Sequence, residues 1–333
     1  MAALVGAVGT GRTVSVRAVI RRDVILRAAI RKPVRISAAA VLTIGLATGL
    51  ATGIGLTSAV RAEATAPGLQ AQRLAQTVAQ TVAQTVAQVA DVLAGADVII
   101  LGEVHDNKRH HQVQAELVAA LQPRAVVWEM ITQEQAEALT PQILQNPAET
   151  ARVLAWEASG WPDFTLYAPV FKRAARAMQF GALVPRTHAK EALQLGVANH
   201  FGAQAQQFGL DQPLPVAEQA TREAEQMANH CNALPDHVLP MLVDVQRLRD
   251  ASLAAAAKRA LEQTGGPVVV ITGNGHARLD RGLAVYLQRA LPGVVIRALG
   301  QMEEGAIQGG FDVVLSAPAV QRPDPCLGFA KSD

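Results

Sequence analysis

The sequence predicts an α/β protein, with a parallel sheet flanked by helices and a small helical subdomain. Short apolar, β-branched runs alternate with longer segments of helical spacing. Half of the 333 residues are hydrophobic and only 17% are charged, which is enough to fill a sizeable core. Strands that alternate with helices imply parallel strands joined by right-handed crossovers.

The expected elements follow in order along the chain. Short apolar runs predict strands at Asp97–Leu101, Ala125–Trp128, Ala182–Val184, Val268–Thr272, Val294–Leu299 and Asp312–Ser316. Apolar spacing of three and four predicts helices over 108–121, 133–158, 166–180 and 279–290. Pro141 and Pro147 should break the second helix, because proline has no amide hydrogen to donate.

Residues 1–64 predict an export segment. An arginine-rich stretch precedes the apolar run Ile36–Leu56, and the small residues of Ser58–Ala64 follow it. This is the order of a signal peptide, so we expect an exported protein, periplasmic or membrane-associated. The weak hydrophobicity of the run favours cleavage, and membrane contact would come only through this segment if it stays uncleaved.

Residues 65–90 predict a linker, and 91–333 the folded domain. Residues 77–88 are three copies of Thr-Val-Ala-Gln, whose period of four predicts a helical spacer, with a partner-binding helix as the alternative. Within the domain, residues 203–262 contain no strand candidate and have helical periodicity. We expect them to form an inserted helical subdomain.

Charge and motifs exclude several function classes. The formal net charge is +2, and most of the excess lies in the first 35 residues. No basic stripe with interleaved aromatic residues follows, so we expect no nucleic-acid partner. The sequence also contains no P-loop and no Gly-x-Ser-x-Gly elbow, which argues against a serine hydrolase.

Three predicted strands each end in a residue suited to chemistry. Two apolar runs are followed by Gly-x-x-His, which places Glu103 and His105 after the first and His276 after the second, while Glu129 follows Ala125–Trp128. Ligands of parallel sheets bind beyond the carboxyl ends of strands, so we expect these four side chains to form one polar site. Each could ligate a metal, carry a proton or orient a neighbour.

The segments around these residues suggest supporting roles. Asp106-Asn107 suits a helix N-cap, and His110 and His111 are expected on the solvated surface of that helix. Aromatic residues are scarce, so the density over Trp156–Phe164 predicts a pocket wall or a ligand-contacting patch. Tyr167 follows it and is the better functional candidate of the two tyrosines, because a tyrosinate can ligate ferric haem, whereas Tyr286 is expected in the core.

The second half of the chain adds residues whose roles stay open. Gln246, Arg249 and Asp250 share one helix face, which either reaches the site or is solvated. Cys231 and Cys326 could pair in an oxidising compartment or remain free thiols. A Cys-His metal site at His230-Cys231 is weakly supported, because no second ligand lies at the right spacing.

Several of these motifs, in order, resemble the ChaN-like haem-binding proteins. The matching segments are Leu101–Asn107 with His110-His111, Trp128–Met130, Trp156–Phe164, Tyr167–Phe171, His230–Pro235, Gln246–Asp250, Gly273–Arg278 and Arg322–Cys326. The resemblance implies a role in haem or iron uptake, with haem bound at a homodimer interface through tyrosine. It makes Tyr167 the candidate iron ligand, with Trp161, His230 and Arg249 as further haem contacts, and it implies a Cys231–Cys326 disulfide.

The wider superfamily offers a rival. The chain also resembles Tiki proteases and erythromycin esterases, in which paired Gly-x-x-His motifs and acidic residues support hydrolysis, in some members with a divalent metal. That resemblance implies catalysis by Glu103, His105, Glu129 and His276, with Glu103 and the two histidines as the metal ligands. Whether the protein is an enzyme stays open, and a non-catalytic envelope scaffold is a third hypothesis. Two features depart from the family pattern: Leu183–Arg186 is not preceded by asparagine, and the N-terminal segment has no lipid-anchor cysteine.

Overall fold

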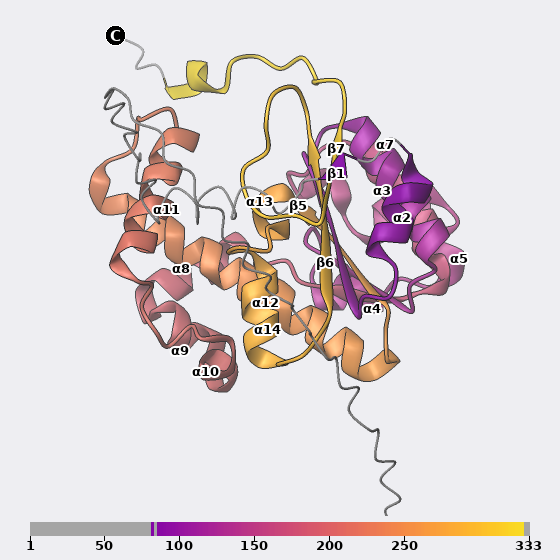
Figure 1. Ribbon diagram of the computed structural model, residues 1–333, viewed down its shortest axis with the longest axis horizontal. Helices are drawn as coiled ribbons and strands as arrows, with labels where there is room; N and C mark the ends of the chain where they lie inside the picture. Colours follow the sequence, from indigo (N-terminus) through magenta and orange to yellow (C-terminus); the bar gives the residue numbers. More distant parts are fainter. Residues whose placement is uncertain (1–80, 83–84, 330–333) are drawn as a thin grey trace, which may run out of the picture. The chain divides into compact units, whose positions relative to one another are not determined.

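A parallel sheet forms the centre of the computed structural model, which describes residues 81–82 and 85–329 (Figure 1). Within these residues the sheet has seven strands in the order β1-β7-β6-β2-β5-β3-β4, and every pairing is parallel. The strands are β1 (Thr81–Val82), β2 (Val98–Glu103), β3 (Ala125–Trp128), β4 (Met178–Gly181), β5 (Val268–Gly273), β6 (Ile296–Met302) and β7 (Val313–Ser316). The predicted α/β class is confirmed.

The central strands are buried on both faces. Every residue of β2, β3 and β5 is buried, because helices cover each side of a parallel sheet. Glu103 at the end of β2 lies opposite Gly273 at the end of β5. The two Gly-x-x-His segments therefore leave the sheet side by side.

Two layers of helices cover the sheet. Ile99 and Leu101 face the layer of α2 (Val86–Leu93), α3 (Lys108–Leu121) and α7 (Phe164–Arg173). Val98 and Ile100 point the other way, toward α10 (Ala205–Phe208), α12 (Leu239–Thr264) and α14 (Leu283–Ala290). Figure 1 shows the first layer in indigo and magenta and α12 and α14 in orange, on opposite sides of the strands.

The segment after β3 is broken as the prolines predict. It forms α4 (Gln133–Glu137), α5 (Pro141–Leu144), α6 (Pro147–Val153) and the 3₁₀ turn η1 (Trp156–Ala158). Pro141 and Pro147 each stand at the first position of a helix, where a missing amide hydrogen costs no hydrogen bond.

The predictions around residue 180 were wrong. The helix predicted over 166–180 ends at Arg173, a turn η2 (Ala174–Arg176) follows, and the strand is Met178–Gly181 instead of Ala182–Val184. Met178 pairs with Ala125 and Gly181 with Trp128, so pairing with β3 sets the register. Met-Gln-Phe-Gly carries little β signal of its own, and its strand conformation comes from this neighbour.

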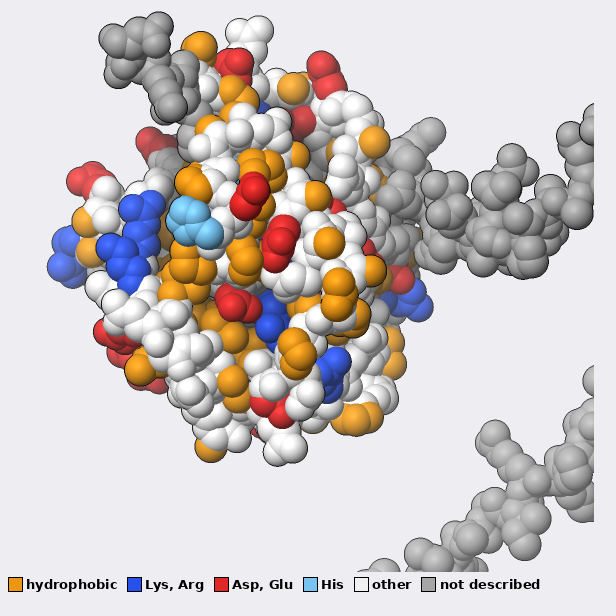
Figure 2. All heavy atoms as spheres, turned by 90° about the vertical axis from the view of Figure 1, so that its left-hand side faces the viewer, with side chains coloured by type: hydrophobic (Ala, Val, Ile, Leu, Met, Phe, Trp, Pro, Cys, Tyr) orange, Lys and Arg blue, Asp and Glu red, His pale blue; other side chains and the backbone are white. Residues whose placement is uncertain are grey.

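Helices fill the chain between β4 and β5. They are α8 (Arg186–Leu195), α9 (Val197–Phe201), η3 (Gly202–Gln204), α10, α11 (Val216–Asn229), η4 (Asp236–Val238) and α12. The 26-residue α12 also contributes Ala251, Ala254 and Ala257 to the core beside the sheet. The subdomain boundaries at 203–262 stay a prediction. On the side of the molecule that carries α8, α9 and α11, apolar side chains are spread among charged ones (Figure 2).

The N-terminal predictions lie mostly outside the described residues. The export segment 1–64 and the linker up to residue 80 are among them. The Thr-Val-Ala-Gln repeat is not one continuous helix, because Thr81–Val82 pair with β7 and Thr85 caps α2 through a capping box with Gln88. Threonine favours both strands and N-caps, which explains the departure. In the described part of the chain, no helix is both long and apolar enough to cross a membrane.

The C-terminal tail is fixed to the helical part of the chain by a disulfide. Cys231, just after α11, is bonded to Cys326, in the turn η5 (Pro325–Phe329). The disulfide implied by the family resemblance is confirmed, and the tail beyond β7 is tied back to the end of α11.

Candidate functional site

The four strand-end side chains converge at the carboxyl edge of the sheet. His105 Nδ1 lies 2.7 Å from Glu103 Oε1, and His276 Nε2 lies 3.6 Å from Glu129 Oε1. Gly273 stands between the two pairs, since a Cβ there would lie 2.9 Å from His105 Nε2 and 3.8 Å from Glu129 Oε2. Glycine at this position therefore leaves the room that His105 occupies.

Glu103 forms the first cluster with its neighbours. Its side chain is fully buried, and its Oε1 accepts hydrogen bonds from His105 Nδ1 and from the Tyr167 hydroxyl, at 3.0 Å. Burial and the carboxylate of Glu103 raise the pKa of Tyr167 far above its usual range. The pKa of His105 is raised as well: burial lowers it, but the carboxylates of Glu103 and Glu129 outweigh that effect.

His110 and His111 belong to this buried region, so the prediction that they lie on a solvated surface was wrong. Both have no exposed surface. His110 Nδ1 accepts from the Val104 amide at 2.9 Å, and His111 Nε2 donates to the His105 carbonyl at 2.8 Å. The chain leaving β2 needs partners for these backbone groups, and the first turn of α3 supplies them. Asn107 caps α3 as predicted.

His111 also completes the surroundings of Glu103. Its Nδ1 faces Glu103 Oε2 at 3.4 Å, and neither atom has a hydrogen-bond partner among the described residues. The ring of His111 packs against that of Tyr167, with centroids 4.2 Å apart. Tyr167, His105 and His111 therefore surround one buried carboxylate, and the first two donate hydrogen bonds to it.

His276 forms the second cluster between two carboxylates. Its Nδ1 donates to Asp250 Oδ1 at 2.7 Å, while its Nε2 faces Glu129. Glu129 Oε2 accepts from Thr272 Oγ1 at 2.6 Å and from the Gly273 amide at 2.8 Å.

The charges of this second cluster support one another. Burial lowers the pKa of His276, but the carboxylates of Glu129 and Asp250 raise it further and the net direction is upward. Burial raises the pKa of Glu129, yet the positive His276 and His105 and two hydrogen bonds leave it below its usual value. Burial raises the pKa of Asp250. The arrangement favours an imidazolium between two carboxyl groups.

The shared face of Gln246, Arg249 and Asp250 reaches this site. Asp250 is 1% exposed and bonds His276, and Gln246 Nε2 lies 3.0 Å from the same ring nitrogen. The sequence singled out this face through its i, i+3, i+4 spacing but could not orient it. The one signal for His111 was its place in the ChaN-like motif, which does not show that its ring is buried beside Glu103.

A pocket of about 350 Å³ opens beside the second cluster. Glu129 lies at this pocket together with Trp161 and Arg249, and mostly apolar residues complete the wall. The remaining lining residues are Ser159, Gly160, Ala182, Leu183, Val184, Pro185, Arg186 and Leu253. Trp161 also packs edge-on against His105, with ring centroids 4.9 Å apart. Of the aromatic residues in the predicted patch, Trp161 lines the pocket beside both clusters, whereas Trp156 and Phe164 are buried in the core.

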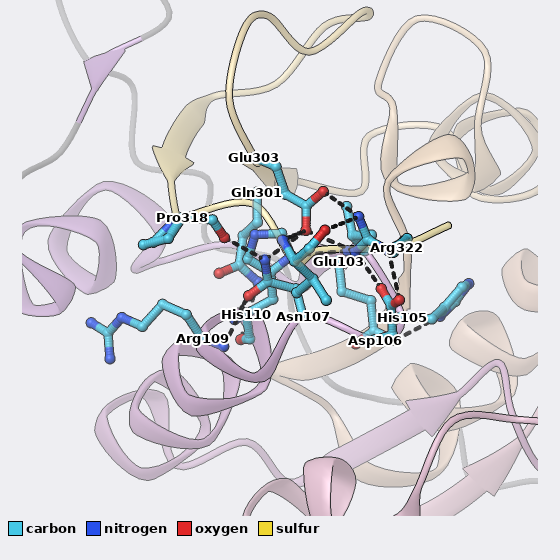
Figure 3. Close-up of polar contacts among 12 residues, drawn as sticks. Glu103, His105, Asp106, Asn107, Arg109, His110, Gln301, Glu303, Pro318 and Arg322 are labelled. Atoms are coloured by element: carbon cyan, nitrogen blue, oxygen red, sulfur yellow. Dashed lines mark hydrogen bonds and ion pairs between the residues drawn. The ribbon is translucent and has the colours of Figure 1, made fainter. Parts of the chain in front are cut away.

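The C-terminal tail is fastened beside His105 (Figure 3). Arg322 bonds both Asp106, with Nε 2.6 Å from Oδ2, and Glu303, with Nη1 2.7 Å from Oε2. Asn107 donates to Glu303 Oε1 at 2.8 Å and to the Pro318 carbonyl at 3.0 Å. Arg322 lowers the pKa of Glu303 to about 2. These bonds hold the turn after β2, which carries His105, against the tail.

The comparison with protein families decides what kind of protein this is. The model of the family described as haem-binding uptake, Tiki superfamily, ChaN matches residues 89–287, which include both clusters and the pocket. This chain belongs to that family. No curated protein matches it.

One solved structure supports the fold of this ChaN-family chain. ChaN of Campylobacter jejuni, solved with cofacial haem, is 20% identical over 67% of this chain and 87% of its own, with a TM-score of 0.51. The type III effector HopBA1 is 13% identical over 70% of this chain and 94% of its own, with a TM-score of 0.40. The first similarity supports the fold, and the second is too low to carry an argument.

The tyrosines of this ChaN-family chain do not fit the iron-ligand role. Tyr167 has no exposed surface, and its hydroxyl is committed to Glu103. Ligation requires a phenolate, which burial and a neighbouring carboxylate oppose. Tyr286, the other tyrosine, is 5% exposed, in the core as predicted. The position of Tyr167 therefore argues against the predicted ligand and suits a residue that orients Glu103 and His105.

Some of the other predicted haem and metal residues lie at the pocket and others do not. Trp161 and Arg249 line the pocket beside Glu129. His230 does not line it, because it ends α11 beside the disulfide, with Nδ1 bonded to the Gln226 carbonyl. No three His, Cys, Asp or Glu side chains within the described ranges are arranged to hold a metal ion, and that includes Glu103, His105 and His276.

Proposed function

We propose that this protein is an exported haem-binding protein of haem or iron uptake, and that haem contacts the pocket lined by Trp161, Arg249 and Glu129. Membership of a haem-binding uptake family supports haem as the ligand. In this chain the observation that supports the proposal is the pocket itself. It has a volume of about 350 Å³, and its largely apolar wall includes two arginines, Arg186 and Arg249.

The lining of the pocket offers partners both to the apolar porphyrin ring of haem and to its anionic propionates. The ring of Trp161 and the side chains of Leu183 and Leu253 offer apolar surface to a porphyrin. Arg249 and Arg186 form no ion pair with any described residue, so their guanidinium groups are available to the propionates. Bound haem would supply the iron, while these residues orient the ring and hold its carboxylates.

A hemin titration tests this assignment. The purified protein should shift the Soret band of hemin, and Arg249→Gln should weaken the apparent affinity roughly tenfold, the size of one charge-assisted hydrogen bond. Arg173→Gln is the matched control, because Arg173 is exposed at the end of α7 and does not line the pocket. Equal affinity in the two variants, or no Soret shift, would reject the pocket as the haem site.

Export and dimerisation complete the proposal. The order of basic, apolar and small residues before residue 65 supports export to the periplasm or to a membrane surface. The family resemblance supports a homodimer around haem. Cell fractionation should find the protein outside the cytoplasm, and sedimentation should show a monomer that becomes a dimer on adding hemin. A cytoplasmic protein or a haem-bound monomer would contradict these parts separately.

Hydrolysis is a second candidate function, and the His276 cluster favours it. An imidazolium held by Asp250 lies next to Glu129, and across Gly273 the Nε2 of His105 is free of protein hydrogen bonds in the described structure. One histidine could then donate a proton while the other accepts one from water. Turnover of an ester or peptide panel that His276→Gln abolishes would support this candidate. Elemental analysis would show whether a divalent metal takes part. The absence of turnover across the panel would exclude hydrolysis.

A further inference from the structure

A second cavity, which the haem proposal does not use, lies on the other side of His276. Its volume is about 400 Å³. Gln246 and Asp250, which contact Nδ1 of His276, line this cavity, whereas Glu129, which faces Nε2, lines the first pocket. The partners of the two ring nitrogens of His276 therefore line different cavities.

Three arginines give this cavity its character. Arg222 comes from α11, and Arg278 and Arg281 follow α13 (Asn274–Ala277). Their side chains are only 7%, 13% and 14% exposed. Burying three guanidinium groups in one place is costly unless acceptors surround them.

Carboxylates within the protein position these arginines but leave donors over. Glu218 accepts from Nε and Nη2 of Arg222, and Asp280 accepts from Nε and Nη2 of Arg278. Glu225 pairs with Arg281 and, at 3.8 Å, with Nη1 of Arg278.

Each guanidinium has five N–H groups, so this pairing does not use them all. Nη1 of Arg222 and Nε and Nη1 of Arg281 donate to no described residue. One carboxylate, Glu225, serves two of the three arginines. The cavity therefore offers spare donors in fixed positions.

The loop between β6 and β7 forms part of the wall of this cavity. Ala306, Ile307 and Gln308 line it, and the next residue, Gly309, packs on the Arg278 side chain. A Cβ at Gly309 would lie 2.4 Å from Nε of Arg278, and its φ of +112° also requires glycine. This position holds the loop against the arginine.

We propose that this cavity binds a small organic anion, whose carboxylate or phosphate group is held by Arg222, Arg278 and Arg281. Guanidinium groups match the planar or tetrahedral oxygens of such groups. The rest of the ligand carries polar groups that meet the amides of Gln226, Asn229 and Gln246, beside the smaller apolar part of the wall formed by Val243, Ala306 and Ile307. A volume of about 400 Å³ lies in the range of small-molecule pockets and exceeds what a bare inorganic oxyanion fills.

Calorimetric titration of the full chain, free of haem, tests the proposal. Glucose 6-phosphate and citrate serve as probes of the two head groups, and glucose serves as the uncharged control. One of the two anions should bind, glucose should not, and Arg281→Met should weaken binding roughly tenfold or more. Arg173→Met is the matched control and should bind as the unmodified protein does. The same titration distinguishes phosphate from carboxylate recognition.

A substitution with the opposite expected effect guards against loss of folding. Glu225→Gln keeps the size of the side chain but removes the carboxylate that competes for Arg278 and Arg281, so anion binding should tighten several-fold. Glu116→Gln, at an exposed ion pair on α3, should change nothing. Absence of binding by both anions, equal binding in Arg281→Met, or weaker binding in a folded Glu225→Gln protein would overturn the proposal. None of these results depends on haem binding.

Discussion

His105 and His276 stand at matched positions after two neighbouring strands, yet their surroundings differ. The side chain of His105 is 33% exposed and has one close carboxylate, whose other partners are a tyrosine and a second histidine. The side chain of His276 is 9% exposed and lies between two carboxylates. The same Gly-x-x-His motif thus gives one accessible ring with a free Nε2 and one buried ring that favours a positive charge.

This difference shows that the motif sets position whereas the packing sets protonation. Glycine lets the chain turn at the end of each strand and brings the histidines close. The charge of each ring then depends on the carboxylates that packing brings to it, Glu103 and Glu129 for His105 and Glu129 and Asp250 for His276. The following predictions test the contrast, beginning with the largest effect.

Removing the counter-ion of His276 should have the largest effect on stability. Asp250→Ala leaves a buried imidazole without its hydrogen-bonded carboxylate, which should lower the free energy of unfolding by about 3 kcal/mol. Urea denaturation followed by circular dichroism measures this. A loss below about 1 kcal/mol would mean that Asp250 does not stabilise a charged His276 in the folded protein.

Removing the hydroxyl that orients Glu103 should have a smaller effect. Tyr167→Phe deletes a buried hydrogen bond and should cost roughly 1–2 kcal/mol in unfolding free energy. Because Tyr167 is buried, the Tyr167→Phe protein should shift the Soret band of added hemin as much as the unmodified protein does. A lost Soret shift in a folded Tyr167→Phe protein would restore tyrosine as the iron ligand.

The raised pKa of His276 predicts how stability depends on pH. A folded-state pKa above the unfolded value of 6.5 stabilises the protein fully below pH 6.5, and this contribution is lost as the pH rises through the folded value. The lowered pKa of Glu129 acts oppositely, giving stability above about pH 4.5 that is lost as the pH falls.

Unfolding free energy should therefore fall as the pH rises above about 6.5 and through the folded-state pKa of His276, by on the order of 1 kcal/mol for each unit of upward shift. This loss of stability with rising pH should be smaller in His276→Gln than in the unmodified protein. His105→Gln should reduce it less, because solvent screens the charge of the more exposed His105 ring. An identical pH profile in both variants would remove the contrast between the two histidines.

The smallest expected effect concerns accessibility. Diethyl pyrocarbonate should modify His105 faster than His276, as measured by mass spectrometry of the separate peptides, because only His105 is substantially exposed. Trp161→Ala should increase the rate at His105 alone, since Trp161 packs against that ring. Faster modification of His276 would show that its cavity opens in solution.

Much of the site could be predicted because it follows short motifs. Glu103, His105, Glu129 and His276 each stand directly after an apolar strand, and parallel strands end at a common edge. Their convergence needed no knowledge of distant contacts. The strand β4 could not be predicted in the same way, since Met178–Gly181 owes its conformation to pairing with β3.

The partners of those side chains could not be predicted, for a physical reason. Tyr167 had the right chemistry for iron, but only the packing of α7 against the sheet shows that it is buried beside Glu103. The sequence suggested a surface position for His111, but in the structure its ring is buried and its Nε2 donates to the carbonyl of His105.

The two Gly-x-x-His ends and Glu129 were determined by the sequence itself, because local strand and turn preferences fix which residues stand at a strand end. The tertiary structure alone decided which carboxylates surround each histidine and which cavities lie beside them. Burial and distant carboxylates such as Asp250 control protonation, and no local pattern records which helix will bring them there.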